Sequence, residues 1–191
     1  LCSMRVLVTL SLLWACGAAQ HYTQCDVSSC SCLGISLEHL APKHPAEGAL
    51  RLQQQNGPDV FLLNLCYPMT AGEGGGHDLA GCANTSIGTS FLRKDTHADQ
   101  CSYLGDTASM QAGYATADHG VPALDVQYTH LTNTGAGKAG LSTVVITLTQ
   151  GNDTWPSNVT QVNNSYYTLS WAGLQNTPVQ PAPPPPVNVH G

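Results

Sequence analysis

Cysteines are the side chains of this chain whose type and spacing most clearly predict chemistry. Six of the eight follow residue 20, and they can either oxidise to disulfides or bind a metal as thiolates. Cys30 and Cys32 are separated by one residue, which is not the two-residue spacing common in zinc sites, and no second matching pair follows. We therefore predict a disulfide framework without metal, in which Cys30 and Cys32 bond to different partners. The six cysteines are Cys25, Cys30, Cys32, Cys66, Cys82 and Cys101.

Other side chains that often carry catalysis form no recognisable arrangement. The eight histidines are scattered, and a proline separates His39 from His44, so these two are not expected on one helical face. The Gly-x-Ser-x-Gly pattern of many hydrolases does not occur, and an oxidised cysteine is not a nucleophile. We interpret Asp95, Asp99 and Asp106 as solvated side chains of a polar loop. The sequence therefore predicts a protein that is not an enzyme and needs no cofactor.

Aromatic side chains suggest binding instead. Planar rings pack on the C–H faces of sugars, while amides and hydroxyls bond to sugar hydroxyl groups. Tyr128, Tyr166, Tyr167 and Trp171 lie on predicted strands rich in such polar neighbours. The competing interpretation is that alternating aromatic residues face the core.

The N-terminal segment predicts the compartment in which these groups would act. Met4-Arg5 is followed by an apolar run over residues 6–15 and by the small residues of segment 17–19. This order is typical of a secretory signal peptide, and we place its cleavage after Ala19. A core helix or an uncleaved anchor is the alternative, although the run is too short to span a bilayer.

Four N-x-S/T sequons agree with a secretory route. Three of them fall between two apolar segments, which predicts an exposed glycosylated loop. The four candidate glycosylation sites are Asn84, Asn152, Asn158 and Asn163.

Composition narrows the class of partner. Charged residues make up 9% of the chain, the formal net charge is −6 and no basic cluster occurs, so nucleic acid and anionic membrane surfaces are not expected as partners. The hydrophobic content of 42% is enough for a core. No run of eighteen apolar residues follows the signal, so we expect membrane attachment only through a helix beyond Gly191.

Strand patterns dominate the rest of the chain. Residues 60–65 form a short apolar run, residues 142–148 are β-branched, and residues 124–129 and 165–171 alternate polar with apolar side chains. The glycine-rich segment 135–140 can join two of these strands as a hairpin. Weaker strands are predicted at 50–52 and 91–92, and one helical turn at 36–40. We predict an all-β fold, a flattened antiparallel barrel or sandwich stabilised by disulfides in its N-terminal half.

The order of these features resembles that of mannose-6-phosphate receptor homology (MRH) domains. In that family a D-L-S-x-L segment leads to a strand that ends I-N-x-C-x-P-L, and here residues 37–40 precede a strand that ends Asn64-Leu65-Cys66-Tyr67-Pro68. Residues 104–105, 124–128, 142–148 and 167–171 resemble the family's later L-G, L-x-L-x-Y, R-S-x-x-I-x-F-x-C and C-x-Y-x-F-x-W segments. The resemblance covers about residues 25–177. Together with the N-terminal segment and the prolines near the C-terminus, it divides the chain into a signal peptide (1–19), an MRH-like β-domain (20–177) and a proline-rich linker or stalk (178–191).

The resemblance also implies a carbohydrate site. Lectins of the family hold mannose with a Gln, an Arg, a Glu and a Tyr. Tyr167 matches the tyrosine, Gln161 stands near the position of the acid, and Gln100 is the candidate for the glutamine. The arginine position falls at Leu141 or Ser142, and Lys138 is the nearest cation.

We therefore expect a degenerate or absent mannose site on a luminal binding or sorting module of the Golgi, endosome or autophagy pathway, or an extracellular protein. Its expected partners are a glycan or glycoprotein and other proteins of the secretory pathway. The alternative is a secreted structural glycoprotein of a cell wall or matrix, which the low charge and the proline-rich tail favour.

Overall fold

The computed structural model describes residues 21–41, 49–69, 88–95, 100–133, 139–175 and 179. The predicted signal peptide lies outside these residues, as do Asp99, Lys138 and nearly all of the proline-rich segment. Cys82 and Asn84 also fall outside them.

The protein is all-β. Its described residues form strands in three sheets and short 3-10 turns, with no α-helix among them. The larger sheet has six strands in the order β1-β8-β9-β10-β12-β11, and a second sheet has four in the order β4-β5-β6-β7. The bounds of the six are Thr23–Gln24, Gln111–Thr116, Pro122–Asn133, Ala139–Gln150, Tyr166–Leu174 and Thr160–Asn163. Those of the four are Leu50–Gln53, Val60–Leu63, Thr89–Asp95 and Gln100–Asp106.

The remaining elements are small. Strands β2 and β3 form a two-stranded ribbon, and the 3-10 turns η1, η4 and η5 connect other elements within the described ranges. Their bounds are Ser31–Cys32, Ile35–Ser36, Glu38–Leu40, Thr107–Ser109 and Asp118–Gly120.

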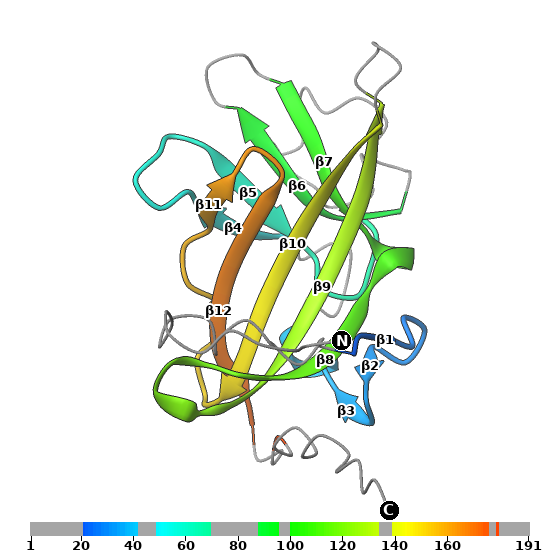
Figure 1. Cartoon of the computed structure of the whole chain (residues 1–191), viewed down its shortest axis with the longest axis vertical. Coiled ribbons are helices and arrows are strands. Elements are labelled where there is room, and N and C mark those ends of the chain that lie inside the picture. The colour runs from blue at the N-terminus through cyan, green and yellow to red at the C-terminus, as the bar shows by residue number, and fades with distance from the viewer. Residues whose placement is uncertain are drawn as a thin grey trace, which may run out of the picture.

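The pairing of strands corrects the expectation of a purely antiparallel fold. After β10 the chain crosses through residues 151–159 to form the edge strand β11, and it then returns as β12 between β10 and β11. This insertion makes β10 and β12 parallel, whereas every other pair of named strands is antiparallel. No closed barrel is found among the described residues. In Figure 1 the four-stranded sheet lies behind the six-stranded one, and its strands run in a different direction.

Most predicted strands are present. The hairpin of β9 and β10 is confirmed, with Val126 paired to Ile146, and η1 accounts for the predicted helical turn. Interpreting residues 95–106 as a polar loop is wrong for most of the segment. Asp95 ends β6, and residues 100–106 are strand β7, whose outward positions are polar because they face solvent.

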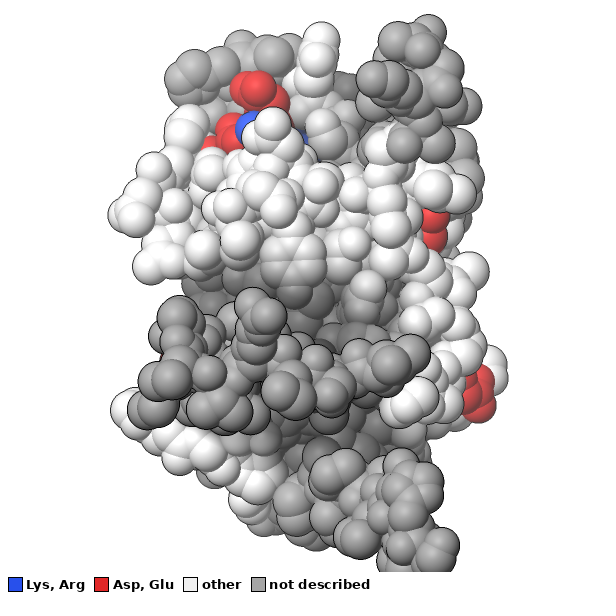
Figure 2. Space-filling view, in the orientation of Figure 1, with Lys and Arg blue, Asp and Glu red and all other residues white. Residues whose placement is uncertain are grey.

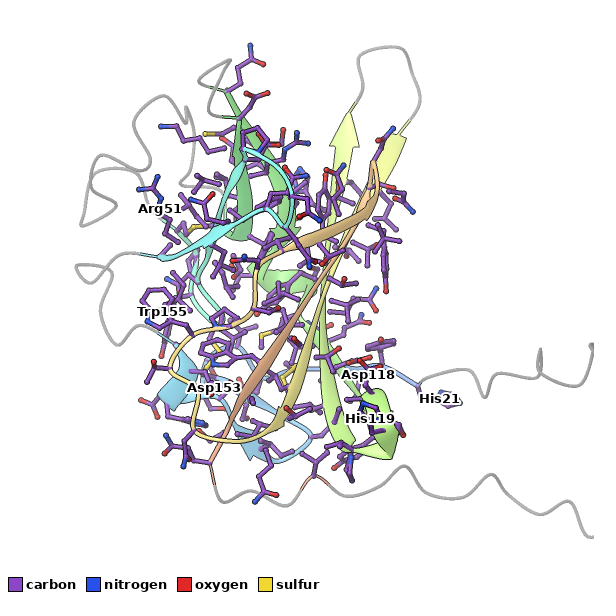
Figure 3. All side chains as sticks on the ribbon, turned by 90° about the vertical axis from the view of Figure 1, so that its left-hand side faces the viewer. His21, Arg51, Asp118, His119, Asp153 and Trp155 are labelled. Atoms are coloured by element: carbon purple, nitrogen blue, oxygen red, sulfur yellow. A yellow bond between two sulfur atoms is a disulfide. The ribbon has the colours of Figure 1, made fainter. Side chains whose placement is uncertain are left out.

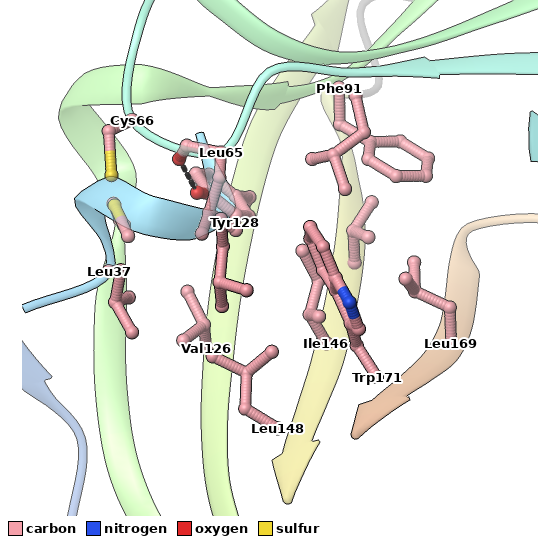
Figure 4. Close-up of a cluster of buried hydrophobic side chains, with 14 of the residues drawn as sticks. Leu37, Leu65, Cys66, Phe91, Val126, Tyr128, Ile146, Leu148, Leu169 and Trp171 are labelled. Carbon is pink, nitrogen blue, oxygen red and sulfur yellow. Dashed lines mark hydrogen bonds between the residues drawn. The ribbon is translucent and has the colours of Figure 1, made fainter. Parts of the chain in front are cut away.

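The inner face of the large sheet builds the core in register rows. One row contains Leu124, Leu148 and Trp171, and the next contains Val126, Ile146 and Leu169. Side chains that are paired on adjacent strands point to the same face, so each row forms a continuous apolar layer. All of these side chains are buried. Figure 4 shows five of them together in the core: Val126, Ile146, Leu148, Leu169 and Trp171.

Two contacts bring the sheets together. Along one side, the amide of Gln55 donates to the carbonyl of Val159 over 2.7 Å, and the Val159 amide donates to Gln53 over 2.9 Å. On the other side β7 lies against β9, where a Cβ on Gly105 would come within 2.6 Å of the Tyr128 Cβ. Only glycine allows this approach, which sets the distance between the sheets next to the pocket described below.

Disulfides hold the N-terminal segment on this core. Cys25 bonds to Cys32 and Cys30 bonds to Cys66, so the prediction that Cys30 and Cys32 have different partners is confirmed. Cys101 is also disulfide-bonded. Structural disulfides form and persist outside the reducing cytosol, so these bonds indicate an oxidising environment such as the secretory pathway or the extracellular space.

The surface carries few charges. The face in Figure 2 shows small, separated acidic groups and very little basic surface. Across the part of the chain that the structure describes, no helix is both long and apolar enough to cross a membrane.

Candidate functional site

A pocket of about 550 Å³ opens between the two sheets. The turn between β11 and β12 closes part of its rim. This volume is within the usual range for small-ligand sites. Its principal lining residues are Arg93, Ser102, Tyr103, His130, Leu141, Ser142, Asn164, Ser165 and Tyr167.

The pocket forms where the apolar rows of the inner face end. The third row contains Tyr128, Val144 and Tyr167, and the fourth pairs His130 with Ser142. Strands β9 and β10 therefore change from apolar to polar side chains at the level where β12 begins. Because this change occurs in register, the polar groups meet at one place between the sheets.

Arg93 provides the cation of the pocket. It lies on β6, and its Nε donates to Oδ2 of Asp59 over 2.7 Å while its Nη2 lies 2.5 Å from the same oxygen. Asp59 precedes β5, and its side chain is 7% exposed compared with 29% for Arg93. Burial on its own lowers the pKa of Arg93, but the hydrogen bond and the charge of Asp59 outweigh it and raise that pKa above its usual value. The guanidinium is thus a fixed cation whose charge is balanced by a buried carboxylate.

Tyr167 connects this ion pair to the turn at the rim. Its ring is buried, and its hydroxyl donates to the carbonyl of Asn164 over 3.3 Å. The hydroxyl also interacts with Arg93, a contact that adds to the rise in the pKa of Arg93. Asp59, Arg93, Tyr167 and Asn164 therefore form a continuous chain of polar contacts along the wall of the pocket.

A second acid, Asp106, contacts the lining residue His130. Nδ1 of His130 is 2.8 Å from Oδ1 of Asp106, and the ring of His130 is 6.0 Å from that of Tyr103. This contact orients the imidazole where it lines the pocket. The wall therefore offers one aromatic ring and one oriented donor or acceptor group.

Of the residues predicted to bind sugar, the structure places only Tyr167 in this pocket. Gln161 is paired with Tyr167 across β11 and β12, but its side-chain Oε1 accepts a hydrogen bond from Gln54 over 3.2 Å. Gln100 is exposed at the start of β7, two residues before Ser102. Lys138 lies outside the described residues.

Sequence reasoning missed the arginine of the pocket. The family resemblance places a cation on β10, where this chain has Leu141 and Ser142, and both of these line the pocket. Arg93 reaches the same space from the opposite sheet. Its only sequence signal is a charged residue after the apolar run 91–92, and that signal does not specify which strand lies across from it.

The sequence allowed two interpretations of the four aromatic residues, sugar binding or core packing, and the structure places three of the four in the core. Tyr128, Tyr167 and Trp171 are buried in the core, while Tyr166 points to the outer face of the sheet. Trp171 donates from its indole to the carbonyl of Asp153 over 2.8 Å. Asp153 and the exposed Trp155 lie in the segment that joins β10 to β11, away from Asp118 and His119 in the turn after β8 (Figure 3).

A second hollow, of about 350 Å³, lies on the outer face of the large sheet. Hydroxyl groups and two acids line it, and Thr147 donates to Asp125 over 2.7 Å. It contains no aromatic or cationic lining residue, so it offers less for orienting a ligand than the pocket between the sheets. Among the residues described, no group of three or more His, Cys, Asp or Glu could hold a metal ion.

Comparison with family models and curated proteins does not assign the chain to a family. No family model matches it, and a search of curated proteins finds no match.

Proposed function

We propose that this protein is a binding or sorting module of the secretory pathway, of the MRH type, and that the pocket between its sheets is a remodelled, weak carbohydrate site. The observation that carries this proposal is the contact chain from the buried Asp59 to Arg93 and Tyr167, of which the last two line the pocket. In this chain of contacts Tyr167, which matches the tyrosine of the family pattern, contacts the guanidinium of Arg93. That guanidinium comes from β6, whereas the family resemblance places the cation on β10.

The arrangement of the strands also supports the proposal. A flattened barrel of the MRH type needs two sheets that pack face to face. The hydrogen bonds between residues 53–55 and Val159 join the edges of the two sheets on one side, and β7 packs on β9 at the other. We infer a flattened, incompletely closed barrel. We propose Golgi or endosomal residence from the family resemblance alone, because the oxidised cysteines support only an oxidising compartment such as the secretory pathway or the extracellular space.

Charge balance specifies the class of ligand. Asp59 neutralises Arg93 at close range, and no other Lys or Arg among the described residues lines the pocket. A phosphate would have to bind beside the carboxylate of Asp59, and the repulsion between two negative charges makes this unfavourable. Neutral sugar hydroxyls can instead accept hydrogen bonds from the guanidinium and form further hydrogen bonds with Ser102, Ser142 and His130. We expect a neutral sugar rather than a phosphorylated one.

Binding of immobilised mannose-type glycans by the full chain, secreted through an oxidising host and checked for free thiols, tests the proposal. Arg93→Gln should lower the affinity about tenfold or more, because a charge-assisted hydrogen bond contributes about 1.5–3 kcal/mol. Arg51→Gln, the same change on β4, is the matched control and should leave the affinity unchanged. The proposal fails if the oxidised, folded protein binds none of the glycans, or if both variants bind as the wild type does.

A further inference from the structure

The sequon at Asn163 stands at the rim of the pocket. Asn163 ends β11 and pairs with Tyr166 at the start of β12, and Asn164 and Ser165 form the two-residue turn between them. Both turn residues line the pocket. The sequon Asn163-Asn164-Ser165 therefore includes part of the pocket wall.

The side chain of Asn163 is held over this turn. Its Oδ1 accepts hydrogen bonds from the amide of Ser165 over 2.9 Å and from the Ser165 hydroxyl over 3.3 Å. Asn163 is exposed. The carboxamide is thereby held against Ser165, which lines the pocket, so a group attached to its nitrogen begins at the turn that forms part of the pocket wall.

The other described sequons lie elsewhere. Asn152 is exposed and follows the end of β10 that is remote from the pocket. Gln150 follows Ser142 by eight steps along the extended strand β10, which corresponds to about 26 Å. Asn158 is exposed beside Val159, where the edges of the two sheets meet. Of the three sequons in the described part of the chain, only that of Asn163 shares a turn with the pocket.

We propose that Asn163 carries an N-linked oligosaccharide that covers the pocket and limits the access of ligands. In the transfer, Nδ2 of Asn163 forms a bond to the anomeric carbon of an oligosaccharide carried on a lipid diphosphate. The bond from that carbon to the diphosphate oxygen breaks, the lipid diphosphate leaves, and the proton lost from Nδ2 passes to a base. The effect on ligand binding rests on the proposed function, whereas the covering of the pocket does not.

The size of the effect follows from the fraction of time that the glycan covers the pocket. If the pocket is open only one-tenth of the time, its apparent affinity for an external ligand falls about tenfold. A neutral, hydroxyl-rich pocket wall also suits contact with the protein's own glycan.

The test compares the secreted full chain with its Asn163→Gln variant, and uses Asn152→Gln as the matched control. Mass spectrometry of glycopeptides measures the occupancy of each sequon. Modification by diethyl pyrocarbonate then reports access to the pocket without any ligand, because His130 lines the pocket, and the exposed His119 serves as an internal reference. Binding to mannose-type glycans is measured in parallel.

We expect an occupied Asn163, faster modification of His130 in Asn163→Gln but not in Asn152→Gln, and about tenfold tighter glycan binding by the same variant. An unmodified Asn163, or a rate at His130 that is the same with and without its glycan, overturns the inference. If His130 becomes more reactive while no form binds a sugar, the covering glycan is confirmed and the proposed function fails.

Discussion

The two ends of the inner sheet face use the same strands for opposite purposes. At one end Leu124, Leu148 and Trp171 form a sealed apolar row. At the other end the same strands present His130 and Ser142 to a pocket. The twelve-residue strands β9 and β10 are long enough to serve both regions, so the chain forms its core and its candidate site without a separate binding domain.

The tyrosines of the third row mark the border between these ends. Tyr128 and Tyr167 both pair with Val144, one from each side. The hydroxyl of Tyr128 donates to the carbonyl of Leu65, as Figure 4 shows, and burial raises the pKa of Tyr128 far above its usual value. The hydroxyl of Tyr167 instead contacts Asn164 and Arg93 at the pocket. The comparison predicts that changes at the sealed end alter stability, whereas changes at the pocket end alter binding.

The largest effect is expected at the sealed end. Trp171→Ala should lower the free energy of unfolding by about 3–5 kcal/mol, because it removes a large buried ring and leaves a cavity. Chemical denaturation of the oxidised protein measures this loss. Ser170→Ala, on the exposed face of the same strand, should change stability by less than about 0.5 kcal/mol. Similar losses in the two variants would contradict the assignment of this face to the core.

Removing the Cys30–Cys66 disulfide should have the next largest effect. The double variant Cys30→Ser, Cys66→Ser loses a bond that closes a long loop, with a sequence separation of 36, and its free energy of unfolding should fall by about 2–4 kcal/mol. Glycan binding by the molecules that remain folded should match that of the wild type, because neither cysteine lines the pocket. A parallel loss of binding and stability would show that the two ends are coupled.

A matched pair of tyrosine variants tests the border directly. Tyr128→Phe should lower the free energy of unfolding by about 1–3 kcal/mol, since the buried carbonyl of Leu65 loses its donor. Tyr167→Phe should cost less stability but should weaken glycan binding, and Tyr166→Phe on the outer face should affect neither. Thermal unfolding and glycan binding, measured on all three variants, separate the contribution of each hydroxyl to stability from its contribution to binding. Equal effects of Tyr128→Phe and Tyr167→Phe on glycan binding would show that the two tyrosines do not separate a region that sets stability from a region that sets binding.

The smallest effect is a pH dependence at Asp26, which belongs neither to the apolar rows nor to the pocket lining. Hydrogen bonds from the hydroxyls of Ser28 and Ser29, and then from their amides, lower the pKa of Asp26 from 3.8 to about 2. A carboxyl group whose pKa is lower in the folded state stabilises the fold above its unfolded pKa and loses that contribution as the pH falls. The difference in thermal stability between wild type and Asp26→Asn should therefore shrink between pH 4 and pH 2. A constant difference across that range would mean that these hydrogen bonds do not favour the charged carboxylate.

The sequence allowed the strands to be predicted more fully than the site. Alternation identified the buried face of Tyr167, Leu169 and Trp171, because period-two patterns report burial directly. It missed β7, whose polar outward positions resemble those of a loop. Arg93 could not be found in this way, because its partnership with Tyr167 depends on which strands face each other between two sheets, and local pattern carries no such information.

The insertion of β12 between β10 and β11 also imposes an order on biosynthesis. A chain made from its N-terminus presents the disulfide-bonded segment first, and both neighbours of β12 emerge before β12 itself. Until residues 166–174 arrive, the edge of β10 is unpaired and β11 has no partner in this sheet. The binding pocket, which takes Tyr167 from this last strand, is therefore among the final features to form, and any lectin activity would be confined to molecules whose synthesis has passed that point.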